Sequence, residues 1–181
     1  VTEGWAMLMQ HLTDDPAWLT RRLDFPRPDE FAVEGVTQLL YMVRRYCAKL
    51  LYELDFHTAD DVTALSSRYV ADDPTTMKDR YVELLGDALK IEPAAEDYLG
   101  DIDASFYVTG YLRSWALEAQ LRTHLRERFG RDWFTQREAG TLLRELWETG
   151  MSKTADELLH DVTGAEIEKE AVGTLVRETL S

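Results

Sequence analysis

Apolar residues recur along most of the chain at steps of three and four, the spacing of one face of an α-helix. The clearest example runs from Pro28 to His57, where Pro28 suits a first helical turn and Asp29 and Glu30 suit its positive end. Its apolar stripe consists of Val33, Val36, Leu40, Val43, Cys47, Leu50, Leu51 and Leu54. No segment alternates convincingly with a period of two. The sequence therefore predicts an all-α fold, a bundle-like array of helices with no sheet.

Start and stop signals divide the chain into further helices. The residues from Val1 to Leu8 already have helical character, and a later helix begins at Asp60 and Asp61 and ends at 72–74, Asp-Asp-Pro. Another runs through Lys90 and stops before a proline. A long helix then covers about 101–129 and ends at a glycine. These signals predict helices separated by short loops.

Two capping boxes begin helices in the last third of the chain. The residues Thr135 to Glu138 read T-Q-R-E, and the helix that they begin ends at Gly150. The residues Thr154 to Glu157 read T-A-D-E and begin a short helix that ends near Gly164. A last amphipathic helix completes the chain.

The organisation predicts one domain that belongs to a longer protein. The sequence has no internal repeat, no Gly/Ser linker and no low-complexity tract, so we expect residues 1–181 to form a single all-α domain. The chain begins with Val1 rather than Met, and it begins inside a predicted helix. We therefore expect it to be the C-terminal portion of a longer polypeptide.

Composition excludes several classes of partner. The chain has 34 Asp+Glu against 20 Lys+Arg and a net charge of −14, whereas nucleic-acid binding needs a basic face. No apolar run approaches the ~18 residues of a membrane span. The single cysteine excludes an internal disulfide framework and fits a reducing cytoplasm.

The histidines do not form a metal-binding pattern. No two of them have the HxxxH spacing, and the one ExxH, Glu157 to His160, lacks the second copy that a di-iron bundle needs. Glu53 and His57 are four residues apart and could form a surface pair. The four histidines are His11, His57, His124 and His160. Structural roles are favoured for all of them, and we expect no metal site built from this chain alone.

The segment from Ala104 to Leu117 carries a single charge, that of Arg113. A helix that is apolar all round is typically central and buried, so its polar atoms need partners. Tyr107 and Tyr111 lie four residues apart and project from one face. They are either core tyrosines bonded to backbone carbonyls or phenols in a cleft that donate to an oxyanion; these residues alone favour the first.

The opening helix places a carboxylate beside a glycine. Glu3 and Gly4 precede an apolar turn from Trp5 to Met9. Glycine inside a helix costs about 1 kcal/mol relative to alanine, so it usually marks the close approach of another element. A carboxylate on such a face needs a cation or hydrogen-bond donors.

These two segments together resemble the thimet oligopeptidase/oligoendopeptidase-like zinc metallopeptidases, of the HExxH…Glu gluzincin type. The sequence V-T-E-G-W-A-M-L, from Val1 to Leu8, looks like the family's helix that carries the third zinc ligand. The sequence F-Y-V-T-G-Y, from Phe106 to Tyr111, is similar to its later tyrosine-rich helix. The likeness covers roughly residues 1–130.

The resemblance implies a site and a reaction. Glu3 would be the metal ligand completing a His₂Glu zinc site, and the HExxH helix would lie upstream of the chain. Tyr107 and Tyr111 would stabilise the oxyanion, with Tyr111 favoured because Gly110 lets a substrate approach. For Arg113, a buried ion pair is favoured over contact with a peptide carboxylate. The chain departs from the family's pattern at Gln10, Ile102 and Asp103, where the family often has a Glu and a His.

The expected function is therefore the C-terminal helical part of a zinc-dependent peptidase, acting on peptides and inactive when separated from the rest of its polypeptide. The alternative is a non-catalytic all-α interaction domain, in which Glu3 and the tyrosines are ordinary packing residues.

Overall fold

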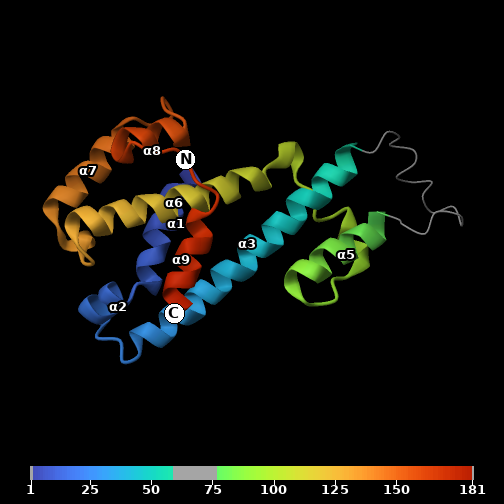
Figure 1. The fold of residues 1–181 in the computed structure, drawn as a ribbon, viewed down its shortest axis with the longest axis horizontal. Coiled ribbons are helices and arrows are strands. Elements are labelled where there is room, and N and C mark those ends of the chain that lie inside the picture. The colour runs from blue at the N-terminus through green and yellow to red at the C-terminus, as the bar shows by residue number, and fades with distance from the viewer. Residues whose placement is uncertain (1, 59–76, 181) are drawn as a thin grey trace, which may run out of the picture. The chain divides into compact units, whose positions relative to one another are not determined.

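The computed structural model describes residues 2–58 and 77–180, and all the regular secondary structure within these ranges is helical (Figure 1). The predicted all-α fold is confirmed. The helix predicted between Asp60 and Pro74 lies outside the described residues. None of the helices described is long and apolar enough to cross a membrane.

The chain divides into two compact units. The first comprises Val1–Gln38 and Arg113–Ser181, and the second comprises Leu39–Leu112. Two helices contribute to both units: α3, Pro28–Thr58, and α6, Val108–Phe129.

The first unit packs its helices around the central part of α6. One core cluster joins Leu8, Leu125 and Leu143, and another joins α6 to α8 through Leu117 and Leu159. Besides parts of α3 and α6, the elements are α1 (Thr2–His11), the 3₁₀ helix η1 (Leu12–Asp14), α2 (Pro16–Leu23), η4 (Trp133–Thr135), α7 (Arg137–Glu148), α8 (Ala155–Thr163) and α9 (Ala171–Leu180).

The second unit packs the C-terminal part of α3 against α5, Met77–Leu89. Tyr52 of α3 is fully buried against Tyr81 of α5, and its hydroxyl donates to the carbonyl oxygen of Tyr98 at 2.8 Å. Two 3₁₀ helices follow α5: η2 (Ala95–Tyr98) and η3 (Ala104–Phe106). The unit ends in the first residues of α6.

Several helix ends agree with the predicted signals. The span of α3 matches the predicted one to within a residue. Before α8, the Thr154 side chain accepts from the Glu157 N–H at 3.3 Å, and Glu157 accepts from the Thr154 N–H at 2.8 Å. This confirms the second capping box and gives Glu157 a structural role. Gly130 and Gly164 follow α6 and α8 with φ of 85° and 74°, as glycine permits.

The prediction of the first capping box, at Thr135 to Glu138, is wrong. Thr135 ends the 3₁₀ helix η4, and its hydroxyl donates to the Asp132 carbonyl oxygen at 2.9 Å. The N-cap of α7 is Gln136, without a side-chain cap, because the 3₁₀ turn already uses the threonine.

The long helix also begins later than predicted. The α-helical part starts at Val108, after a turn in which Ser105 and Phe106 have φ of 58° and 52°. The apolar residues before Val108 therefore form this turn and not a buried helix. The side chains of Tyr107, Thr109 and Arg113 are exposed, so the start of α6 is not buried either. Within the segment predicted to be buried, only its last part is: Ser114, Ala116 and Leu117 are buried.

Candidate functional site

The two predicted catalytic tyrosines lie side by side in the second unit. Tyr107 follows η3 and Tyr111 lies in the first turn of α6, with ring centroids 5.4 Å apart and planes nearly perpendicular. Tyr111 also meets the ring of Tyr46 on α3, at 5.3 Å. The Tyr107 side chain is 54% exposed, and a Cβ added at Gly110 would meet no atom within 4 Å. Tyr107 therefore lies at the surface of its unit, where the expectation of a core tyrosine is wrong, and Tyr111 is half-buried beside it.

The predicted metal ligand, Glu3, is half-buried on α1 in the first unit. A Cβ at Gly4 would lie 3.0 Å from Cδ2 of Leu117 and 3.6 Å from the carbonyl oxygen of Ser114. The glycine is therefore where α1 closely approaches α6, as the sequence predicted. The described residues contain no group of three His, Cys, Asp or Glu side chains that could hold a metal ion. Glu3 thus stands as a single candidate ligand.

The predicted substrate-binding residue, Arg113, forms an ion pair with Asp156 of α8. Both side chains are about half exposed, so the expectation of a buried ion pair is wrong. The exposed helix surface around residue 113 explains this, since α6 becomes buried only one residue later. Arg113 and Glu3 belong to the first unit and the two tyrosines to the second.

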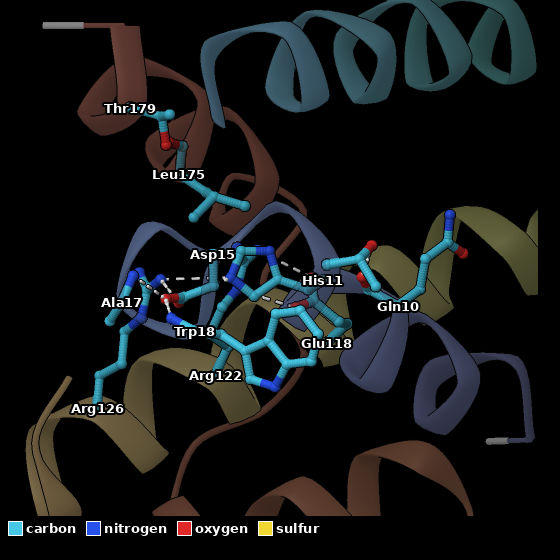
Figure 2. A network of polar contacts seen from close by, with 11 residues as sticks. Gln10, His11, Asp15, Ala17, Trp18, Glu118, Arg122, Arg126, Leu175 and Thr179 are labelled. Atoms are coloured by element: carbon cyan, nitrogen blue, oxygen red, sulfur yellow. Dashed lines mark hydrogen bonds and ion pairs between the residues drawn. The ribbon is translucent and has the colours of Figure 1, made fainter. Parts of the chain in front are cut away.

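The first unit contains a buried polar network whose long-range contacts have no local signal in the sequence. Figure 2 shows its members, which come from α1, the loop before α2, and α6. Arg122 pairs with Glu118 one turn earlier, with Nε 2.9 Å from Oε1 and Nη2 donating to Oε2 at 3.0 Å. Both are about 3% exposed. The network comprises His11, Asp15, Glu118, Arg122 and Arg126.

Asp15 connects this network to the start of α2. Its carboxylate accepts from the N–H groups of Ala17 and Trp18 at 2.8 and 3.1 Å, which caps the helix, and from Nη2 of Arg126 at 2.6 Å. Nε2 of His11 lies 3.5 Å from the same carboxylate. The network therefore links the end of α1, which carries Glu3 at its other end, to α2 and α6.

His11 is held in its neutral form. Nη1 of Arg122 lies 2.7 Å from Nδ1 of the ring, and a guanidinium N–H only donates, so the ring nitrogen that it meets must accept. Burial lowers the pKa of His11 from 6.5 to about 4, and the charges of Arg122 and Arg126 act in the same direction against Asp15. Burial alone would raise the pKa of Asp15, but hydrogen bonds from His11 and Arg126 hold it well below its usual range. At neutral pH the network therefore contains a neutral His11 and an ionised Asp15.

We expect the pH dependence of stability to report on His11. Above pH 6.5 the imidazole is neutral whether the chain is folded or unfolded. Below it the unfolded chain takes up the proton first, so the folded state loses about 3 kcal/mol as the pH falls from 6.5 to about 4. Denaturant melts of the wild type and His11→Gln across this range should show a flatter profile in the variant. Asp15 adds a further loss below pH 4, because its folded pKa is lowered.

The matched control is His160→Gln, at an exposed position of α8. This variant should keep the wild-type profile. Burial also lowers the pKa of His124, which leaves a residual slope in every protein. Equal slopes in His11→Gln and the wild type would show that the His11 ring is not buried as a neutral acceptor.

The second unit contains another buried polar pair, Lys49 and Glu53 of α3. Glu53 is fully buried and accepts from the Asp103 N–H at 2.9 Å. The surface pair expected between Glu53 and His57 is therefore wrong. His57 instead contacts the ring of Phe106, with centroids 5.2 Å apart. The available signal was a lysine and a glutamate four residues apart, next to Ala48 and Tyr52, which face the core.

Comparison with known proteins found no match: no family model fits the chain, and neither a curated protein nor a solved structure is significantly similar to it.

Proposed function

We propose that the chain is the C-terminal helical part of a zinc-dependent metallopeptidase that hydrolyses peptide bonds. The observation that carries the proposal is the pair of neighbouring tyrosines. The ring centroids of Tyr107 and Tyr111 lie 5.4 Å apart, and the backbone at Gly110 between them has no other atom within 4 Å of where a Cβ would lie. One exposed and one half-buried tyrosine with an open approach suit contact with a peptide, whereas tyrosines that only fill a core are usually enclosed.

Each residue has a part in the proposed reaction. Glu3 supplies an anionic oxygen ligand to zinc, and the remaining ligands belong to a preceding part of the polypeptide. When bound, zinc polarises the scissile carbonyl and lowers the pKa of a water molecule to ~7. The phenols of Tyr107 and Tyr111 donate hydrogen bonds to the oxyanion that forms on the substrate. Binding a peptide carboxylate at Arg113 requires displacement of Asp156.

The chemistry of Glu3 and its position on α1 both suit a zinc ligand. A carboxylate is a normal zinc ligand, and the half-buried position of Glu3 limits competition from water. The close contact of Gly4 with Leu117 fixes the helix that carries it. The single cysteine, Cys47, suits a cytoplasmic peptidase.

A non-catalytic interaction domain is the second candidate, and one observation favours it. Cys47, Leu51 and Leu54 form an exposed stripe on α3, with the two leucines 52% and 41% exposed. Exposed apolar stripes on helices often bind partner proteins. This function requires neither zinc nor hydrolysis, which separates the two candidates.

The test is peptide hydrolysis by the complete polypeptide with and without a zinc chelator. We expect a fluorogenic peptide to be cleaved, the activity to disappear with 1,10-phenanthroline, and zinc to restore it. Absence of hydrolysis by zinc-loaded protein, or hydrolysis that the chelator leaves unchanged, contradicts the proposal. An HExxH helix in the sequence preceding Val1 is a simpler check of the same claim.

We expect residues 1–181 alone to bind zinc no better than scattered carboxylates do and to hydrolyse no peptide. The reason is that the described residues supply no group of three ligands. Isothermal titration calorimetry with zinc measures this directly. Stoichiometric binding with sub-micromolar affinity would contradict the division of ligands between this chain and a preceding segment.

A further inference from the structure

The turn that precedes the tyrosine pair has an unfavourable backbone conformation. Ser105 and Phe106 have φ of 58° and 52°, in the left-handed region that L-residues rarely adopt. Neither is a glycine or an asparagine, and one carries a large side chain. Such a conformation persists only where surrounding contacts enforce it.

Two buried side chains of α3 hold the base of this turn. Oε1 of Glu53 accepts from the Asp103 N–H at 2.9 Å, and Nζ of Lys49 donates to Oδ2 of Asp103 at 2.8 Å. Lys49 and Glu53 are 6% and 0% exposed. Asp103 is therefore fixed through both its backbone and its side chain, two residues before the first residue with a positive φ.

Asp101 adds a further contact with α3 and connects the turn to α5. It accepts from Nη2 of Arg45 at 2.7 Å and from the hydroxyl of Tyr81 at 3.1 Å, and it lies 3.4 Å from Nζ of Lys49. Burial alone would lower the pKa of Lys49, but Asp103 and Asp101 outweigh it and raise this pKa. Lys49 therefore stays cationic between these two carboxylates.

The same face of α3 also contacts the aromatic residues. Tyr46, Lys49, Glu53 and His57 are spaced by three, four and four residues, so they lie on one side of the helix. Tyr46 contacts the ring of Tyr111 at 5.3 Å, and His57 contacts that of Phe106 at 5.2 Å. One helix face thus contacts the start, middle and end of the segment that carries both tyrosines.

We propose that Lys49 and Glu53 are positioning residues: they hold the strained turn at 103–106 and thereby set the placement of the phenols of Tyr107 and Tyr111 for catalysis. The inference rests on the proposed function for its catalytic part. Without these contacts Ser105 and Phe106 relax to ordinary φ values, which rotates the chain at Tyr107. A displacement of about 1 Å in a catalytic group can cost on the order of 10²-fold in rate.

The test compares disruptive and conservative variants in the complete polypeptide. Glu53→Leu removes the acceptor and Lys49→Met removes the ammonium group. Each should lower kcat on the order of 10²-fold with zinc content and KM nearly unchanged. Glu53→Gln and Lys49→Arg, which can restore the hydrogen bond to the Asp103 N–H and to the Asp103 carboxylate, should recover most of the rate. The matched control is Asp55→Asn, which removes a partly exposed carboxylate of α3 that binds Arg80 and does not touch the turn.

A second measurement separates this inference from the proposed function. Fluorine NMR of protein labelled with 3-fluorotyrosine, with Tyr107 and Tyr111 assigned from their Phe variants, should show both resonances shifted or broadened in Glu53→Leu and Lys49→Met. They should be unchanged in Asp55→Asn. If Glu53→Leu does not fold, the Lys49 pair of variants decides the result.

Each outcome has a distinct meaning. Unmoved tyrosine resonances in folded Glu53→Leu and Lys49→Met overturn the positioning role, whatever the wild-type activity. A wild type without peptidase activity overturns the proposed function, and the fluorine spectra still decide whether α3 places the tyrosines. Moved resonances with unchanged kcat overturn the catalytic consequence of that placement.

Discussion

Replacing Glu3 with Gln in the complete polypeptide is expected to abolish most of the zinc binding and of the peptidase activity. The substitution keeps the volume of the side chain but removes the anionic oxygen ligand. Loss of a residue that merely supports a ligand costs ~10–100-fold in metal affinity or activity, and loss of a ligand should cost more. Zinc content by atomic emission and kcat/KM on the same preparation measure both effects.

The control for Glu3→Gln is Glu138→Gln. Both glutamates lie in the first turn of a helix in the same unit, so each replacement removes a similar favourable charge from a helix N-terminus, worth about 0.3–1 kcal/mol. Glu138→Gln should keep its zinc and its rate. Full zinc and full rate in Glu3→Gln would mean that Glu3 is not a ligand and that the resemblance of 1–8 to the peptidase helix is misleading.

Replacing Tyr111 with Phe is expected to lower kcat and kcat/KM together, on the order of 10²-fold, with zinc content and KM largely kept. Phe keeps the ring and its contacts with Tyr46 and Tyr107 but removes the hydroxyl. We expect a smaller loss in Tyr107→Phe, because Tyr111 directly follows the open backbone at Gly110. Steady-state kinetics and denaturant melts of both variants provide the measurement.

The control for the tyrosine variants is Tyr41→Phe, an exposed tyrosine of α3. A hydroxyl that only supports the fold would give a different result from a catalytic one: the variant would lose about 1–3 kcal/mol of stability and keep its rate. Unchanged kinetics in Tyr107→Phe, Tyr111→Phe and the double variant would rule out the catalytic role of the pair.

The helices were predictable because their signals are local. The periodic stripe of α3 and the reciprocal hydrogen bonds of Thr154 and Glu157 depend on residues within one or two turns. The prediction at Thr135 failed for a local reason too. Its hydroxyl hydrogen-bonds within a 3₁₀ turn, and the sequence pattern of a capping box does not distinguish this use from an N-cap.

Which face of α3 is buried could not be predicted in the same way. Periodicity favours the stripe through Cys47, Leu51 and Leu54, yet the structure leaves these residues exposed and buries Lys49 and Glu53. The buried pair is stabilised by Asp101 and Asp103, about fifty positions away, and nothing local indicates those partners. The same applies to His11 and Arg122, whose separation in sequence exceeds one hundred residues.

The candidate site was predictable only as far as its residue types. Two tyrosines four residues apart predict neighbouring rings, and that is how Tyr107 and Tyr111 lie. The strained turn at Ser105 and Phe106 comes directly before them, and the sequence there contains no glycine or asparagine to indicate it. The metal-ligand role of Glu3 stays a prediction, because the described residues contain no group of three side chains that could hold a metal ion.

The zinc anomalous signal in crystals of the complete polypeptide tests directly whether Glu3 is a zinc ligand. We expect one zinc ion with a Glu3 carboxylate oxygen at about 2.0–2.2 Å and two further protein ligands from a segment preceding Val1. A zinc ion bound without Glu3, or zinc-soaked crystals with no anomalous peak at Glu3, would contradict it.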